Sequence, residues 1–585
     1  MVNHSDNLGV RALNSVRSTH VGTYLALRKF LDSYPLAEED YLLRDFVTCS
    51  KIKHLPLTNL RTLIFKRISD NIPEYREMHF PCPTRIIADT IVLEIIDRIT
   101  TFKQASTSFS YRLAKTPASR FTFEPYWEGY KDRRNKISSL LLSTNNVMIS
   151  LDFKKFYHNL DPHKVAAALK AHLVSQKSLS RTERWAQDYV VGFLESRPTG
   201  SGLPVGSDLS HFLADLYLEK FDEIVGQKFP GCYFRYVDDL AIVVNAESNN
   251  SVQEFVESTA LKSGGMEINP DKSLVYDSQK WMIANSYRNR PPEATSYSDL
   301  VYRLRVYRLK GGSIEELEAM MGKATERLPI RRLTECVTDP EYQMRVRTHF
   351  DEGHEFAIRA HRTELREMPE LASKAAEKIK NQIDAVAEDE NWTQPEIKPY
   401  IERYLRTLAN QSLFLADESA LRRIKAICER KGTSAEFRAC VDAIVDQNIA
   451  HVLHMPGRAQ HAVVELLGKT GVKKMLAAFL NSYRPEEGEK RNAILASLCE
   501  LSAAGCGDVD FSNLNLGLDE MKAIDAFRGQ FDRKSLVYDG SYTEEVGSLL
   551  SGLEMEDRLR MLWSQRYDGE IQPIFTTKLD GIYYS

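Results

Sequence analysis

Hydrophobic positions in the first 290 residues alternate between runs typical of strands and spacings typical of helices. A continuous apolar run of about four to eight residues favours a buried strand, whereas apolar residues three and four apart favour a helix. We predict a short strand at 75–80, a helix at 86–99, a buried strand at 147–151, a helix at 209–225, two short strands around a tight turn at 233–244, and a helix at 252–264 ended by a glycine pair. The first half is therefore expected to mix strands and helices.

The pattern changes after about residue 290, beyond a stretch rich in proline and polar residues. From there the apolar positions follow helical spacing almost throughout, and residues 463–480 carry one apolar stripe. Repeated helix pairs favour an α-solenoid, although no fixed repeat period is evident. We expect an N-terminal helical extension at 1–75, a mixed strand and helix domain at 76–290, and a helical domain at 291–585.

Composition places the chain among soluble globular proteins. Its 585 residues exceed what one hydrophobic core serves, and its contents of 43% hydrophobic and 27% charged residues are ordinary. The net charge of −4 excludes a uniformly basic protein but leaves room for a local basic groove. Eight scattered cysteines without a CxxC pair argue against a cysteine-based zinc site, and no apolar run approaches the length of a membrane span. The sequence predicts a cytoplasmic protein with no membrane association.

Two adjacent aspartates, Asp238 and Asp239, interrupt the apolar stretch YFRYVDDLAIVV. Two neighbouring carboxylates stay ionised in a buried position only with a compensating cation, and oxygen ligands favour Mg²⁺ or Mn²⁺. A polar hairpin tip without a metal is the plain alternative, because aspartate favours turns. The tetrapeptide YVDD does not decide between the two, so its surroundings must.

Three further features accompany these aspartates in a fixed order along the chain. Asp152 follows the buried strand in MISLDFKKFYHNL, and the loop SGLPVGSDLSH opens the predicted helix at 209–225. After the aspartate pair, Lys272 lies in the predicted turn of MEINPDKSLVY. A strand-end aspartate, a glycine loop with its helix, an aspartate-pair hairpin and a lysine turn follow the order of motifs A, B, C and D in a right-hand polymerase palm.

On these motifs, residues 60–290 resemble a reverse transcriptase, whose motif C is typically YVDD. The resemblance implies an α+β right-hand polymerase with fingers and palm, followed here by an all-α, HEAT-like C-terminal domain. It also implies DNA synthesis from dNTPs by two-metal phosphoryl transfer. Asp152 and Asp238 would bind two Mg²⁺ or Mn²⁺ ions, helped by the backbone carbonyl of Phe153. Asp239 would assist them.

The same resemblance assigns roles around the nucleotide. Lys272 would be the acid for the departing pyrophosphate, with an ordinary exposed turn lysine as the alternative. Tyr157, five residues after Asp152, has the place of the aromatic steric gate that excludes a ribose 2′-OH, so it favours dNTPs. Gly206 would let the backbone approach the incoming base or template. Arg76 would clamp the triphosphate through its planar donor fork, with a solvated strand arginine as the alternative.

A basic segment with interleaved aromatic residues lies between positions 98 and 136. It contains nine basic residues against three acidic ones. Such a segment suits single-stranded nucleic acid, through charge and base stacking, although a solvated charged face has the same composition. The candidate nucleic-acid contacts are Arg112, Lys115, Arg133 and Arg134.

Within the family, the chain resembles the bacterial defence-associated and abortive-infection reverse transcriptases, including the AbiK-like group. The resemblance rests on the SFSYRLAK block, the LPVGSDLSH form of motif B and the long helical C-terminus. Many reverse transcriptases have Gln where this chain has Val205 and Pro where it has Asp208, which puts ordinary template copying in doubt. The group implies anti-phage defence, a homo-oligomer, and DNA synthesis that can start on a protein hydroxyl; the tyrosines, including Tyr583 and Tyr584, offer too many candidates to choose among.

Three other functions stay open. A retroelement-type reverse transcriptase would copy a cognate noncoding RNA into DNA. A non-enzymatic helical scaffold would carry a relict palm, which the intact Asp152, Asp238 and Asp239 argue against. A viral-type RNA polymerase is disfavoured by the aromatic ring of Tyr157, because an RNA polymerase needs a polar partner for the 2′-OH.

Overall fold

The structure of the chain is a computed structural model. It describes residues 8–16, 21–32, 59–69, 72–114, 119, 121–124, 126–142, 145–174, 179–288, 296–321, 340–415 and 417–446, with isolated positions at 330–337 and beyond 473. The chain separates into two compact units, one formed by residues 1–62, 77–283 and 529–551 and the other by the remainder. Each unit is described by itself.

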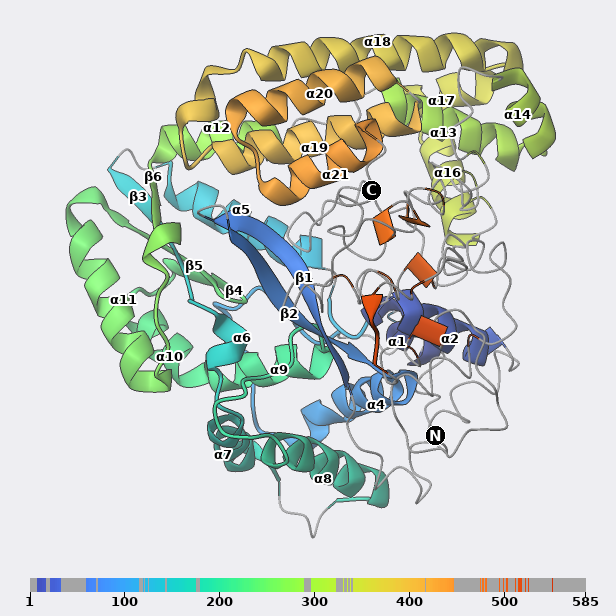
Figure 1. Cartoon of the computed structure of the whole chain (residues 1–585). Coiled ribbons are helices and arrows are strands. Elements are labelled where there is room, and N and C mark those ends of the chain that lie inside the picture. The colour runs from blue at the N-terminus through green and yellow to red at the C-terminus, as the bar shows by residue number, and fades with distance from the viewer. Residues whose placement is uncertain are drawn as a thin grey trace. The chain divides into compact units, whose positions relative to one another are not determined.

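The first unit is built around a four-stranded antiparallel sheet in the order β4–β5–β3–β6 (Figure 1). Its strands are β3 (Asn146–Asp152), β4 (Tyr233–Tyr236), β5 (Asp239–Asn245) and β6 (Leu274–Tyr276). The predicted buried strand is confirmed as β3, and the predicted strand pair around a tight turn is confirmed as β4 and β5. Because β3 pairs with β5 on one side and β6 on the other, its carboxyl end lies beside the β4–β5 turn.

The same unit also contains the helices α4 (Pro83–Ile99), α5 (Tyr126–Leu140), α6 (Phe156–Asn159), α7 (Pro162–His172), α8 (Arg181–Glu195), α9 (Asp208–Tyr217), α10 (Glu219–Lys228) and α11 (Asn249–Gly264), with 3₁₀ turns η3 (Ala246–Ser248) and η4 (Pro270–Lys272). Of these helices, α5 and α11 contact strands of this sheet. Local sequence explains several starts: Asp161 caps α7, and Ser180 with Glu183 forms a capping box on α8. The glycine pair ends α11 as predicted, with Gly265 in the left-handed region.

The helix predicted at 209–225 differs from the structure in one respect. A bend at Leu218 divides it into α9 and α10. Every position from Leu209 to Leu216 is buried, so α9 is a central helix enclosed on all sides and not an amphipathic surface helix.

Two N-terminal helices belong to the first unit, and a strand pair has residues in both units. Helices α1 (Leu8–Val16) and α2 (Val21–Asp32) pack against α4. Strands β1 (Asn59–Ser69) and β2 (Ile72–Pro81) form a two-stranded sheet, and β2 contains the predicted strand at 75–80.

The second unit is helical wherever it is described beyond residue 284. Its helices are α12 (Ser278–Arg288), which begins in the first unit, α13 (Ser296–Leu309), α14 (Ile314–Met321), α16 (Pro340–Asp351), α17 (Glu355–Arg362), α18 (Met368–Ala387), α19 (Lys398–Phe414), α20 (Glu418–Lys431) and α21 (Ala435–Val445), with 3₁₀ turns η8 (Leu365–Glu367) and η9 (Glu390–Thr393). Helices α18 to α21 pack in succession, as stacked helix pairs do (Figure 1). Most of the predicted apolar stripe at 463–480 lies outside the described residues, but Leu476 and Leu480 are buried. None of the described helices is long and apolar enough to span a bilayer.

Candidate active site

The register of the sheet brings three aspartates together. Asp152, the last residue of β3, lies opposite Asp239, the first residue of β5, and Asp238 lies in the two-residue turn between β4 and β5. One ligand oxygen from each carboxyl group can be chosen so that all three lie within 4.8 Å of one another. Within the described part of the chain, this is the one set of three or more His, Cys, Asp or Glu side chains so arranged. Asp152 is buried and the other two are half-buried.

The electrostatics of this group call for a cation. Burial, with the charges of Asp239 and Asp152, raises the pKa of Asp238 to about 7. Burial also raises the pKa of Asp239, although the nearby Arg133 guanidinium opposes this shift. Three close carboxyl groups, with the pKa raised at Asp238 and Asp239, offer only oxygen donors, and this is the environment that Mg²⁺ or Mn²⁺ stabilises. The donor set therefore fits a divalent ion.

Lys272 joins the carboxylates instead of extending freely into solvent. Its Nζ lies 2.8 Å from Oδ2 of Asp152, although 58% of the lysine side chain is exposed. Burial lowers the pKa of Lys272, but the hydrogen bond and the charge of Asp152 outweigh that effect and raise it. The backbone N–H of Asn269 donates to the Asp152 carbonyl at 2.7 Å, so the turn before β6 is tied to the end of β3.

The turn that carries Asp238 has a strained backbone. Val237 has a φ of +56°, in the left-handed region that a β-branched residue rarely adopts. Its N–H donates to Ser110 Oγ at 2.9 Å, and its carbonyl accepts from Arg235 Nη1 at 3.1 Å. The carbonyl of Asp238 accepts from the Phe153 N–H at 3.2 Å. Hydrogen bonds on both sides of Val237 therefore stabilise a conformation that would otherwise relax.

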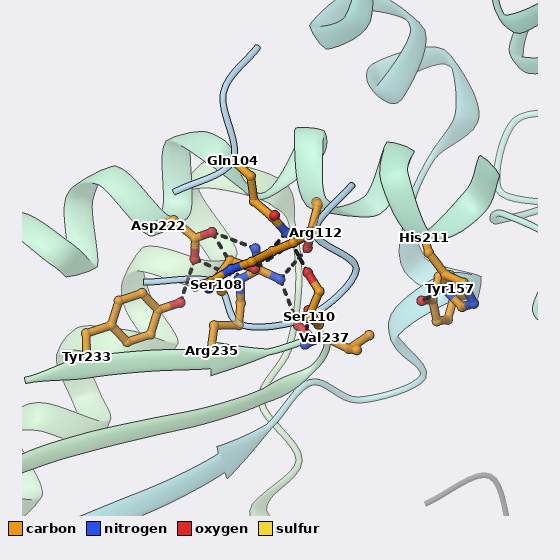
Figure 2. Close-up of polar contacts among 11 residues, drawn as sticks. Gln104, Ser108, Ser110, Arg112, Tyr157, His211, Asp222, Tyr233, Arg235 and Val237 are labelled. Carbon is orange, nitrogen blue, oxygen red and sulfur yellow. Dashed lines mark hydrogen bonds and ion pairs between the residues drawn. The ribbon is translucent and has the colours of Figure 1, made fainter. Parts of the chain in front are cut away.

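The Arg235 side chain occupies a buried charge network under this turn (Figure 2). It is 1% exposed and forms ion pairs of 2.7 Å with both Asp215 and Asp222. Tyr233 donates its hydroxyl to Asp222 at 2.6 Å. The chain therefore satisfies a fully buried guanidinium on several sides, which is the condition for a buried ion pair to be tolerated. Asp215 also accepts a hydrogen bond from Gln104, which lies in the loop just before the SFSYRLAK segment (residues 108–115).

Tyr157, the predicted steric gate, lies in the short helix α6. Its hydroxyl forms a hydrogen bond with Nδ1 of His211, on α9 (Figure 2). The His211 ring stacks on Tyr111 with centroids 3.8 Å apart and planes 6° apart. Burial raises the pKa of the Tyr157 hydroxyl, so it stays protonated. By contrast, Phe156 is buried and stacks on Phe153 as a core aromatic residue.

The glycine loop before α9 packs closely on the gate residue. Gly206 is buried with a φ of +102°, a conformation that favours glycine. Gly202, which the sequence did not single out, has a φ of +67°, and a Cβ there would lie 2.6 Å from the Tyr157 carbonyl oxygen. The Leu203 N–H donates to that same carbonyl at 2.8 Å. The loop and the gate therefore share one rigid contact.

A second buried network, also missed from sequence, anchors the far end of this loop. Ser207 donates its hydroxyl to Asp89 Oδ2 at 2.8 Å, and Tyr189 donates to Asp89 Oδ1 at 2.8 Å. Arg85 donates Nε to the same carboxylate at 2.6 Å, and its guanidinium lies 4.3 Å from the centroid of the Phe193 ring. The available signal was a pair of opposite charges one helical turn apart, Arg85 and Asp89, in a largely apolar helix.

The candidate nucleic-acid contacts separate into different environments. Arg112 donates Nε and Nη2 to the Ser108 carbonyl, at 3.0 and 2.7 Å, and Arg133 Nη2 donates to the Asp239 carbonyl at 3.3 Å. Both therefore support the backbone around the hairpin. Arg134 is half-buried on α5. Lys115 lies outside the described residues, and Arg76 lies in β2 with its side chain outside them.

Residues 83–285 match the family model described as reverse transcriptase (RNA-dependent DNA polymerase). The chain thus carries a reverse transcriptase domain and is an enzyme of the RNA-directed DNA polymerase class. The expected fold, a fingers and palm domain followed by a helical region, is confirmed.

Two solved structures are similar to the chain in fold comparison. Telomerase from Candida albicans is 13% identical, over 70% of this chain and 70% of that one, with a TM-score of 0.27. Telomerase from Candida tropicalis is 10% identical, over 63% of this chain and 68% of that one, with a TM-score of 0.24. Both are complexes with a fragment of telomeric RNA. Scores this low support no conclusion about this chain, and no curated protein matches it.

Proposed function

We propose that the chain joins dNTPs into DNA by metal-dependent phosphoryl transfer at Asp152, Asp238 and Asp239. The observation that carries this proposal is the meeting of these three carboxylates at a strained hairpin inside a reverse transcriptase domain. Asp152 and Asp238, with the carbonyl of Phe153, would hold two Mg²⁺ or Mn²⁺ ions, and Asp239 would assist. Bound divalent ions would lower the pKa of the attacking hydroxyl and neutralise triphosphate charge.

The residues around the carboxylates would position the nucleotide. Tyr157 would exclude the ribose 2′-OH, and Gly206 would let the backbone approach the incoming base. Lys272 is suited to donating a proton to the departing pyrophosphate, because its raised pKa keeps it charged at neutral pH. Arg76 would contact the triphosphate.

For the nucleic acid, we propose Lys115 and Arg134 as direct contacts. Arg112 and Arg133 would act mainly through the backbone carbonyls they bind near the hairpin. Backbone support of this kind changes the position of the aspartates more than it changes salt-dependent affinity, whereas direct phosphate contacts weaken as salt rises.

Within this class, we infer a defence-associated polymerase of the AbiK-like kind that works as a homo-oligomer in the cytoplasm and starts DNA on a protein hydroxyl. The helical second unit, together with Val205 and Asp208 in the glycine loop, supports this choice. Synthesis on a cognate noncoding RNA is the second candidate, favoured by the description of the matching family as an RNA-dependent DNA polymerase.

Labelled dNTPs and NTPs distinguish these possibilities. The purified chain is incubated with Mg²⁺ and each nucleotide, first without template and then with a template and primer, and denaturing gels are run before and after protease digestion. Label that migrates with the protein and vanishes in Asp238→Ala supports protein-primed synthesis. Incorporation that requires added template, and that RNase abolishes, supports RNA copying. NTP incorporation as efficient as dNTP incorporation would contradict the gate role of Tyr157.

A further inference from the structure

The hydroxyl group of Tyr157 is already occupied by a protein partner. It forms a hydrogen bond with His211 Nδ1, and the two rings meet edge to face with centroids 5.4 Å apart (Figure 2). His211 is only 8% exposed. A tyrosine hydroxyl that is hydrogen-bonded to a buried, fixed neighbour has little freedom to rotate away.

The histidine is itself held in place from two directions. Helix α9, enclosed by other elements along its length, sets the position of the His211 backbone. Tyr111 sets the plane of its ring by parallel stacking at 3.8 Å. Tyr111 has a φ of +48° and packs edge-on against Phe123, with centroids 5.2 Å apart. A tyrosine kept in the left-handed region at such a point indicates that its ring position is determined by its surroundings.

We propose that His211, oriented by Tyr111, is the positioning residue that sets sugar selectivity by fixing the ring of Tyr157. This inference rests on the proposed function, in which Tyr157 excludes the 2′-OH. The sequence motifs assign no role to His211 or Tyr111. The ligand it discriminates is a nucleoside triphosphate, ribose against deoxyribose.

The physical reason is that a Tyr157 ring held in one position excludes a 2′-OH better than a ring that can rotate. A ring free to rotate would move aside for a 2′-OH, and an apolar pocket alone rejects an added hydroxyl only about 100-fold. With its hydroxyl held by His211, Tyr157 presents a fixed ring, and the hydroxyl cannot turn toward the ribose without giving up that hydrogen bond. The 2′-OH would then be buried without a partner, which disfavours the ribonucleotide further.

The test is the ratio of kcat/KM for dATP to that for ATP in the full-length protein with Mn²⁺, using whichever template condition supports incorporation. His211→Leu removes the hydrogen bond and Tyr157→Phe removes it from the other side while keeping the ring. Each should lower the ratio by about tenfold, and the double variant should be no worse than either one, because both remove the same bond. His211→Asn, which restores a polar partner near Nδ1, should recover part of the ratio.

The controls separate this inference from the gate itself. His163→Asn, on the exposed start of α7, should leave the ratio unchanged. Tyr157→Ala removes the ring and should lower the ratio most. If Tyr157→Ala lowers it but Tyr157→Phe and His211→Leu do not, the role of His211 is wrong and the gate stands. If Tyr157→Ala leaves the ratio unchanged, the gate role fails. Binding of dATP and ATP, measured by calorimetry, gives the same comparison for any variant with slow turnover.

Discussion

At the scale of single residues, the Asp238 carboxylate is needed for metal binding in the proposed function but destabilises the fold when no metal is bound. Burial and the charges of Asp239 and Asp152 raise its pKa from 3.8 to about 7. The ionised carboxylate therefore destabilises the metal-free fold; this penalty is full above pH 7, shrinks as the pH falls, and is gone near pH 4. Asp238→Asn should raise the stability of the EDTA-treated protein at pH 8 by on the order of 2 kcal/mol, and by clearly less at pH 5.

Thermal unfolding at the two pH values measures this difference. Addition of Mn²⁺ should reverse the order, because the ion stabilises the wild type more than the variant. An equal shift in Tm at pH 8 and pH 5 would show that burial and neighbouring charge do not act on Asp238 as the structure implies.

Two glycines of the same loop provide a matched comparison at this scale. Gly200 and Gly202 have φ values of +77° and +67°, so alanine strains the backbone at both, by about 1–2 kcal/mol. A Cβ at Gly200 meets nothing within 4 Å, whereas one at Gly202 would lie 2.6 Å from the backbone of Tyr157 and His158. Gly202→Ala should therefore raise KM for dNTPs severalfold or more, and Gly200→Ala should not. Steady-state kinetics on both variants tests this, and equal KM values would contradict the proposed contact.

At the scale of elements, the β4–β5 hairpin depends on a loop far away in sequence. Ser110, 1% exposed, accepts the N–H of the strained Val237. Ser110→Ala leaves that half-buried N–H without its partner, at a cost of about 1–3 kcal/mol, and lets the turn relax away from its strained conformation. Turnover should fall by about tenfold while the protein remains folded. Ser139→Ala, on the exposed face of α5, is the matched control.

Circular dichroism of the two serine variants tests whether they remain folded, and single-turnover rates test whether catalysis is slowed. A loss of turnover in Ser110→Ala that Mn²⁺ partly restores would agree with displaced carboxylates. Wild-type turnover in Ser110→Ala would mean that the loop does not position the hairpin.

Elements also show what the sequence could and could not provide. Local pattern predicts β3, the β4–β5 hairpin and the glycine cap of α11, because each depends on neighbours along the chain. The pairing of Asp152 with Asp239 follows from strand register, which local pattern leaves open. The network around Arg235 was missed, although a charged residue within a buried strand and two aspartates seven apart, Asp215 and Asp222, were available signals. His211 gave no such signal, because its partners come from two distant segments.

At the scale of the whole molecule, the sequence predicts a change from mixed to helical structure near residue 290, and the described helices from α13 to α21 agree with it. The chain's bulk charge of −4 gives no hint of a polymerase. The chemistry is concentrated in a small fraction of the residues, so composition averages it away, whereas the order of motifs preserves it.

The most direct measurement of the central claim is metal-dependent dNTP incorporation by the wild type, Asp152→Ala, Asp238→Ala and a control, Asp188→Ala, on the exposed face of α8. Outer-shell partners of a metal already cost 10- to 100-fold on mutation, so loss of a ligand should reduce incorporation by more than about 100-fold. The account predicts such a loss for Asp152→Ala and Asp238→Ala and no loss for Asp188→Ala. It also predicts that EDTA abolishes incorporation by the wild type. Incorporation by folded Asp238→Ala at the wild-type rate would contradict it.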